Sequence, residues 1–280
     1  MKEPFELGRI RVTGGEIAYV DAGEGPAVLL LHGFPTSSFL WRREIPLLAS
    51  RMRVIAPDLL GYGRSERSPG ADLSEPAQAS YLRELLGRLE LSEVAVVGHD
   101  IGGAIAQLIA LDPDGLAVRA LVLIDSACFD AWPIEGVKRL QAVSPEQETP
   151  TFVEDVVRLT FDVGVAHEGM IDGETLAAYL EPWLRDPSSF FRAVRGIEGK
   201  GLAGRDLDLA SVDAPAFIVW GEEDPFLPAE LAERLQEALP GATLALLPGC
   251  SHFVTEDAPR TVGPLVYEFL RVRYVSPATT

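Results

Sequence analysis

The stretch that most constrains the fold is VAVVGHDIGGAIAQLIAL, residues 94–111. Its first four residues are all apolar, which is typical of a buried strand. Glycines at positions 98 and 102 then flank a short turn, and the apolar residues of GAIAQLIAL continue at helical spacing. The segment predicts a buried strand that turns sharply into a helix, with Asp100 at the apex of the turn.

Six further apolar runs have the character of strands, and helical stretches lie between most of them. Continuous apolar strands that alternate with amphipathic helices predict a parallel sheet covered on both faces. SEPAQASYLRELLGRLEL (74–91) and APRTVGPLVYEFLRVR (258–273) are two of the expected helices. The six runs are EIAYVDAG (16–23), PAVLLLHG (26–33), MRVIAPD (52–58), VRALVLIDS (118–126), APAFIVWG (214–221) and ATLALLPG (242–249).

The rhythm of strands breaks between residues 128 and 208. This stretch is mainly helical in pattern and contains several prolines, and it lies between one core strand and the next. An insertion at the carboxyl edge of a parallel sheet lies above the place where such folds bind ligands. We therefore predict a helical cap over residues 128–208 and a core formed by residues 1–127 and 209–280.

The charge of the chain limits its partners. It carries 42 acidic and 24 basic residues, a formal net charge of −18. Such a surface repels nucleic-acid phosphates and acidic lipids, so we expect no nucleic acid and no membrane as a partner. No segment reaches transmembrane length, and the two cysteines, Cys128 and Cys250, lack the spacing of a redox or metal site. We expect a cytoplasmic protein without metal or cofactor, and the oligomeric state stays open.

Three short motifs place candidate catalytic groups in an ordered series. GHDIG (98–102) matches the nucleophile elbow G-x-Nuc-x-G, HGFP (32–35) directly follows an apolar strand, and GCSHF (249–253) places His252 late in the chain. Over nearly its whole length the chain resembles the α/β-hydrolase superfamily, in which nucleophile, acid and histidine follow in this order. The resemblance implies a mostly parallel central sheet, helices on both faces and an inserted helical cap.

An aspartate at the elbow resembles the epoxide hydrolases and the haloalkane and haloacetate dehalogenases. With an ordinary carboxyl pKa of about 3.9, Asp100 is ionised at pH 7 without an activating base. A carboxylate attacks saturated carbon bearing a halide or strained oxygen to give a stable alkyl ester, whereas attack on an ester carbonyl would leave a reactive anhydride. We expect His252 to activate water that hydrolyses the alkyl ester. By position, the backbone N–H groups of Phe34 and Ile101 would stabilise the oxyanion.

His252 needs an acidic partner that fixes its tautomer. Asp224, in VWGEEDPF, follows a strand at the place where many members of the superfamily carry the acid. Asp125, in LVLIDSA, ends an earlier strand, where some epoxide hydrolases and dehalogenases place theirs. Both alternatives stay open, and we favour Asp224 because GEED fits the commoner pattern.

The leaving group depends on the donors that face Asp100. Opening an epoxide builds an alkoxide, which needs hydroxyl or imidazole donors, whereas halide release needs N–H donors. Haloalkane dehalogenases carry tryptophan directly after the nucleophile and haloacetate dehalogenases carry arginine, but this chain has Ile101, and HDIG occurs in some epoxide hydrolases. The candidate substrate-binding residues of the cap are Tyr179 and His167 for ring opening, and Trp132 and Trp183 for halide binding.

The sequence thus predicts a cofactor-independent hydrolase that acts on a small molecule through an aspartyl nucleophile. Epoxide hydrolysis is the first interpretation, and dehalogenation of a haloalkane or haloacetate is the second. The alternative from another class is a non-catalytic protein of the same fold that binds a small molecule without turnover.

Overall fold

The computed structural model describes residue 5 and residues 7–275 of the chain. Its strands are β1 (Leu7–Val12), β2 (Gly15–Ala22), β3 (Ala27–Leu31), β4 (Arg53–Pro57), β5 (Glu66–Arg67), β6 (Glu93–Asp100), β7 (Ala117–Ser126), β8 (Ala216–Gly221) and β9 (Thr243–Leu247). Its helices are α1 (Ile45–Leu48), α2 (Glu75–Arg88), α3 (Ile101–Leu111), α4 (Glu135–Gln141), α5 (Pro150–Gly164), α6 (Gly173–Arg185), α7 (Pro187–Gly196), α8 (Glu230–Ala238), α9 (Val254–Asp257) and α10 (Pro259–Leu270). The 3-10 turns are η1 (Ser38–Trp41), η2 (Pro145–Gln147) and η3 (Asp206–Ser211), and η4 (Arg271–Val275) is a π-helical turn.

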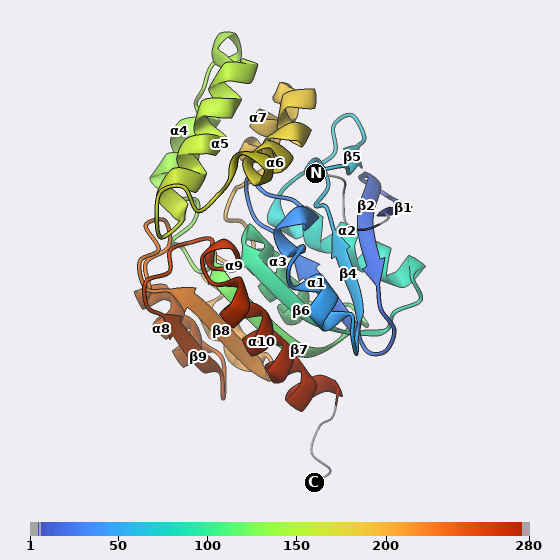
Figure 1. Ribbon diagram of the computed structural model, residues 1–280. Helices are drawn as coiled ribbons and strands as arrows, with labels where there is room; N and C mark the ends of the chain where they lie inside the picture. The colour runs from blue at the N-terminus through green and yellow to red at the C-terminus, as the bar shows by residue number, and fades with distance from the viewer. Residues whose placement is uncertain (1–4, 6, 276–280) are drawn as a thin grey trace.

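The described strands form one twisted sheet in the order β1-β2-β4-β3-β6-β7-β8-β9, with β5 paired to β2 beside this path. Pairing is parallel from β4 through β9, and it is antiparallel where β2 meets β1, β4 and β5. Figure 1 shows helices on both sides of this sheet. The predicted fold class, a mostly parallel sheet between two helical layers, is confirmed.

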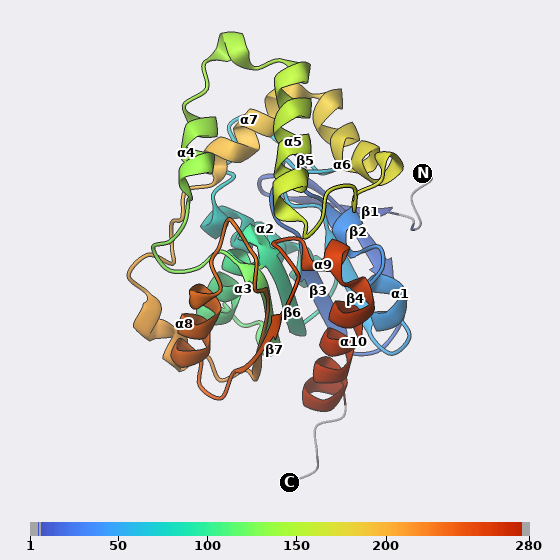
Figure 2. The ribbon, with the colours of Figure 1, turned by 60° about the vertical axis from the view of Figure 1, so that its left-hand side comes forward.

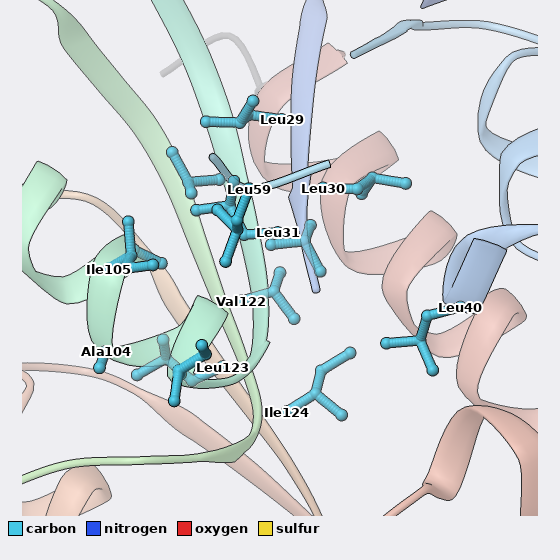
Figure 3. Packing of buried hydrophobic residues seen from close by; sticks show 14 of the residues in the cluster. Leu29, Leu30, Leu31, Leu40, Leu59, Ala104, Ile105, Val122, Leu123 and Ile124 are labelled. Carbon is cyan, nitrogen blue, oxygen red and sulfur yellow. The ribbon is translucent and has the colours of Figure 1, made fainter. Parts of the chain in front are cut away.

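The central strands form because their side chains are apolar on both faces, so each face can be buried under helices. All five residues of β3 are buried, and so are the six of β8. Figure 3 shows the two faces: Leu123 lies beside Ala104 and Ile105 of α3, whereas Leu30 and Leu40 lie on the opposite side of the sheet. The helices α2 and α3 pack against each other on one face, and α1 packs against α10 on the other.

The helices α4 to α7 lie between β7 and β8 in the sequence, and we call residues 128–208 the helical segment. Figure 2 shows these helices stacked above the end of the sheet at which β6 and β7 finish. The order of elements agrees with a core interrupted by an insertion. The boundaries at residues 127/128 and 208/209 stay a prediction.

Two described strands were absent from the sequence-based expectation. β1 lies at the edge of the sheet and alternates polar with apolar residues, and β5 has two residues only. Neither offers the continuous apolar run that identifies a strand buried on both faces. Among the described residues, no helix is both long and apolar enough to span a membrane.

Candidate active site

The elbow is built where β6 ends and α3 begins, and Asp100 occupies the junction with φ 53° and ψ −123°. A non-glycine residue at positive φ is strained and persists only where its surroundings hold it. Gly98 and Gly102, which flank Asp100, allow the tight turn because neither carries a side chain. A Cβ atom at Gly98 would overlap the carbonyl oxygen of Gly102, and one at Gly102 would overlap the carbonyl oxygens of Leu31 and His32. The turn therefore presents the Asp100 side chain at the carboxyl edge of the sheet.

The two oxygens of the Asp100 carboxylate have different surroundings. The Phe34 N–H donates to Oδ2 over 2.8 Å, and the Ile101 N–H also hydrogen-bonds the carboxylate. Oδ1 is buried and accepts no hydrogen bond from any described group. Burial raises the pKa of Asp100 to about 6, against the opposing effects of the His252 charge and the two backbone N–H groups. The site thus holds one oxygen in place and leaves the other free.

His252 is held by Asp224 rather than by Asp125. The Nδ1 of His252 lies 2.8 Å from Oδ2 of Asp224, and Oδ1 of Asp224 accepts the backbone N–H groups of Phe226 (2.8 Å) and Leu227 (3.0 Å). Burial lowers the pKa of His252, but the charge and hydrogen bond of Asp224, with the charge of Asp100, outweigh it, so the net pKa is raised. The hydrogen bond to Asp224 therefore fixes the proton on Nδ1 and leaves Nε2 available as a base.

Asp125, the other candidate acid, binds a backbone N–H group instead of His252. Its Oδ1 accepts the N–H of Gly221 at 2.8 Å, while Oδ2 is buried without a partner. Burial and then the charge of Asp224 hold the pKa of Asp125 well above the ordinary carboxyl value, which favours its neutral form. No hydrogen bond joins Asp125 to His252 in the described structure.

Two further histidines, His32 and His99, form hydrogen bonds with backbone groups near the site. His32 accepts the N–H of Leu59 on Nε2 (2.9 Å), so its Nδ1 carries the proton donated to the Gly33 carbonyl (2.9 Å). His99 donates from Nε2 to the carbonyl oxygen of His252 at 3.0 Å. Burial lowers the pKa of both rings, which are neutral and structural.

An apolar cavity of about 350 Å³ opens onto Asp100 and His252. Its walls come mainly from α4, α5 and the loops around Phe34 and Phe226. The volume and lining are typical of a site for a small organic molecule. The apolar lining residues are Phe34, Trp132, Ile134, Val137, Leu140, Val156, Leu159, Val163 and Phe226. Most of this wall could not be predicted from the sequence, because helical periodicity shows an apolar face without showing whether it meets a core or a cavity.

Of the four candidate substrate-binding residues, the structure brings only Trp132 to this cavity. The Trp132 side chain lines the cavity, and its Nε1 is buried without a hydrogen-bond partner. A buried indole N–H normally finds an acceptor, so this donor is available to a bound group.

The structure places the other three candidates outside the lining of this cavity, and their roles in substrate binding stay a prediction. The Tyr179 hydroxyl donates to Glu256 (2.5 Å) and accepts from Arg42 (3.2 Å), within a buried ion pair that joins α6 to the core. Trp183 donates its indole N–H to the Pro35 carbonyl oxygen at 2.7 Å. His167 is exposed in the loop after α5. The direction in which each helix faces the core, together with partners distant in the sequence, sets where these side chains lie. Neither factor can be predicted from local sequence.

The residues that the structure describes contain no group of three or more His, Cys, Asp or Glu side chains placed to hold a metal ion.

Comparison with known proteins places this geometry in a family. Residues 26–259 match the family model described as the alpha/beta hydrolase fold, so the chain belongs to the α/β-hydrolase family. It is 32% identical to haloalkane dehalogenase 2 of Mycobacterium tuberculosis over 281 residues, 95% of each chain. Its structure is similar to an alpha/beta hydrolase fold protein from Burkholderia ambifaria (TM-score 0.81, 30% identity, 93% of this chain and 97% of that one).

A second solved relative is the epoxide hydrolase CorEH, with a TM-score of 0.79, 25% identity and coverage of 95% of this chain and 98% of that one. The protein is therefore a hydrolase of the α/β fold. Haloalkane dehalogenase 2 and CorEH carry different chemistries in their names, so the choice between these two chemistries rests on the site.

Proposed function

We propose that the protein hydrolyses small apolar substrates by displacing a leaving group from saturated carbon, with Asp100 as nucleophile and halide as the favoured leaving group. The observation that carries the proposal is the unequal environment of the Asp100 carboxylate. Oδ1 has no partner among the described groups, whereas Oδ2 accepts the Phe34 N–H, and the Ile101 N–H also contacts the carboxylate. A carboxylate arranged in this way has one oxygen free to attack, and the other is already seated in an oxyanion hole.

In the first step, Oδ1 of Asp100 attacks the carbon that bears the halogen. A C–O bond forms as the carbon–halogen bond breaks, and the halide leaves with the bonding electron pair. Trp132 is the donor that this wall of the cavity offers to the departing halide, because its Nε1–H is otherwise unpaired. The product of this step is an alkyl ester on Asp100.

In the second step, Nε2 of His252 takes a proton from water, and the water oxygen attacks the carboxyl carbon of the Asp100 ester. Negative charge develops on Oδ2, where the N–H groups of Phe34 and Ile101 receive it. Collapse breaks the ester C–O bond, and the leaving alcohol takes the proton from His252. The carboxyl group of Asp100 then releases a proton to solvent. Asp224 stabilises the imidazolium throughout.

The donors of the cavity favour halide over epoxide. An alkoxide formed from an epoxide needs a proton donor, and the described residues that line the cavity include no tyrosine. The hydroxyl of Thr160, which also lines the cavity, donates to the Val156 carbonyl oxygen at 2.8 Å. The hydroxyl of Tyr179, the expected ring-opening residue, already donates a hydrogen bond to Glu256. Epoxide hydrolysis stays the second candidate, supported by the HDIG elbow and by the likeness to CorEH. The apolar side chain of Ile101 offers no hydrogen-bond donor to either leaving group.

The test is to trap the ester. A His252→Gln variant, incubated separately with butyl bromide and with styrene oxide, is analysed by intact-mass and peptide mass spectrometry. We expect a stable butyl adduct on Asp100, because alkylation needs no base but hydrolysis does. The matched control is His167→Gln, which changes an exposed histidine outside the cavity and should turn over without an adduct.

Each outcome separates the alternatives. An adduct with styrene oxide alone would select epoxide hydrolysis. A protein unmodified by both reagents, together with wild-type protein that turns over neither, would support the non-catalytic binding protein. An adduct on a residue other than Asp100 would overturn the proposed nucleophile.

A further inference from the structure

A second cavity, of about 370 Å³, lies between the core and the helical segment. Four arginines line it, Arg64, Arg67, Arg185 and Arg192, against two carboxylates, Glu66 and Asp186, and we call it the arginine cavity. The whole chain has 24 basic residues against 42 acidic ones, so this is an unusual concentration of positive charge in an acidic protein. Nothing in the proposed chemistry at Asp100 uses it.

The arginines come from both sides of the junction. Arg64 and Arg67 belong to the core, in the turn that leads into β5 and in β5 itself, whereas Arg185 ends α6 and Arg192 lies in α7. The core turn is held in place, because Asp58 accepts the backbone N–H of Arg64 on Oδ2 at 2.7 Å. A ligand in the cavity would therefore contact two elements that are far apart in the sequence.

The local acids do not satisfy all of these guanidinium groups. Arg185 pairs with Glu181 at 2.7 Å, and Arg192 pairs with Asp186 at 2.5 Å. Arg67 forms no ion pair with any described residue, and its Nη1 reaches only the Ser68 carbonyl oxygen, at 3.4 Å. The Nε of Arg192 is buried without a hydrogen-bond partner. Donor capacity thus remains at the cavity wall.

The arginines also repel each other across the junction. The pKa of Arg67 is lowered by burial and then by the charge of Arg192, against the opposing charge of Asp186. The pKa of Arg64 is lowered by burial, against the opposing charge of Glu181, and the charge of Arg185 lowers it further. Like charges that face each other in this way are stabilised by an anion placed between them.

We propose that the arginine cavity binds a small multivalent oxyanion, a compound with two or more phosphate or carboxylate groups. Guanidinium forks match both groups with paired, charge-assisted hydrogen bonds. The volume accommodates a molecule with several such groups. The bound anion bridges Arg67 of the core and Arg192 of α7, so it holds the helical segment against the core.

This bridge adjoins the candidate active site through one side chain. Trp183 lines the arginine cavity, donates to the Pro35 carbonyl, and packs against the ring of Phe34 with centroids 6.2 Å apart. The Phe34 N–H in turn contacts Asp100. Binding is nevertheless measured without any substrate, so the test is independent of the chemistry proposed for Asp100.

The probes are inorganic pyrophosphate and citrate, titrated by calorimetry into the full chain at constant ionic strength, since salt screens half-exposed charges. We expect saturable binding of at least one probe with one site per chain. Arg67→Gln should weaken binding by about tenfold, because it removes charge-assisted hydrogen bonds. This variant leaves no carboxylate unpaired, so the fold should be retained, and circular dichroism checks it. Arg192→Gln is the second variant and should act in the same direction.

The matched control is Arg158→Gln, which removes an exposed arginine of α5 that pairs with Glu154 in its own helix. It should leave the affinity within about twofold of the wild type. Binding of pyrophosphate alone identifies a phosphate ligand, and binding of citrate alone identifies a carboxylate ligand. If neither probe binds at about millimolar concentration, or if Arg67→Gln and Arg192→Gln both bind like the wild type, the proposal is wrong.

Discussion

The same chemical change at two buried aspartates, Asp224→Asn and Asp125→Asn, separates the two acids that sequence motifs left open. In Asp224, Oδ1 accepts two backbone N–H groups and Oδ2 faces Nδ1 of His252. The amide oxygen of the variant must stay on the Oδ1 side, because an NH₂ group there would face two donors. The NH₂ group then faces His252 and forces the ring proton onto Nε2, where a base needs a free lone pair.

The structure gives the size of this effect. Flipping the amide to restore the tautomer would break two backbone hydrogen bonds and leave their N–H groups buried, at about 1–3 kcal/mol each. The variant also loses the charge that stabilises the imidazolium. Together these effects should slow hydrolysis of the Asp100 ester by a factor on the order of 10³ to 10⁴. Ester formation needs no base and should keep a rate within about tenfold of the wild type.

The expected result for Asp125→Asn is different. The raised pKa of this group favours its neutral form, and its Oδ1 accepts the Gly221 N–H in a way that an amide oxygen can reproduce. Turnover should stay within about fivefold of the wild type. Rapid-quench mass spectrometry with butyl bromide measures both steps, since the variant that blocks hydrolysis accumulates the butyl ester. Accumulation in Asp125→Asn, or wild-type hydrolysis in Asp224→Asn, would refute the assignment of Asp224 as the partner of His252.

Three further predictions follow from the site. Asp100→Asn should raise the free energy of unfolding by about 1–3 kcal/mol at pH 8. The reason is that the raised pKa of Asp100 makes its buried anion unfavourable above pH 6. Urea titrations at pH 8 and pH 4 should show that this gain in stability fades at the lower pH. Trp132→Phe should lower kcat/KM for butyl bromide by about ten- to a hundredfold; an unchanged value would exclude its N–H as a donor to halide. Tyr179→Phe should lower stability by about 1 kcal/mol while steady-state turnover stays near wild type, and a selective loss of styrene oxide turnover would restore its expected role in ring opening.

The sequence by itself determined the sheet, the elbow and the order of the candidate residues. Strands such as β3 and β8 are buried on both faces, so each must be a continuous apolar run, and such runs are visible in one dimension. The elbow is equally local, because the strand, the two glycines, Asp100 and the helix all lie within eighteen residues. The edge strand β1 escaped detection because only part of it is buried.

Only the tertiary structure decided which side chains meet at the cavity. Asp125 and Asp224 both lie at the carboxyl ends of neighbouring strands, and the direction of each side chain determined which of them meets His252. Tyr179 faces Glu256, a partner 77 residues away, and Trp132 faces the cavity, because the packing of each helix or loop on the core sets the direction of its side chains. Local sequence encodes backbone conformation and apolar periodicity, whereas contacts between distant segments depend on how the elements dock.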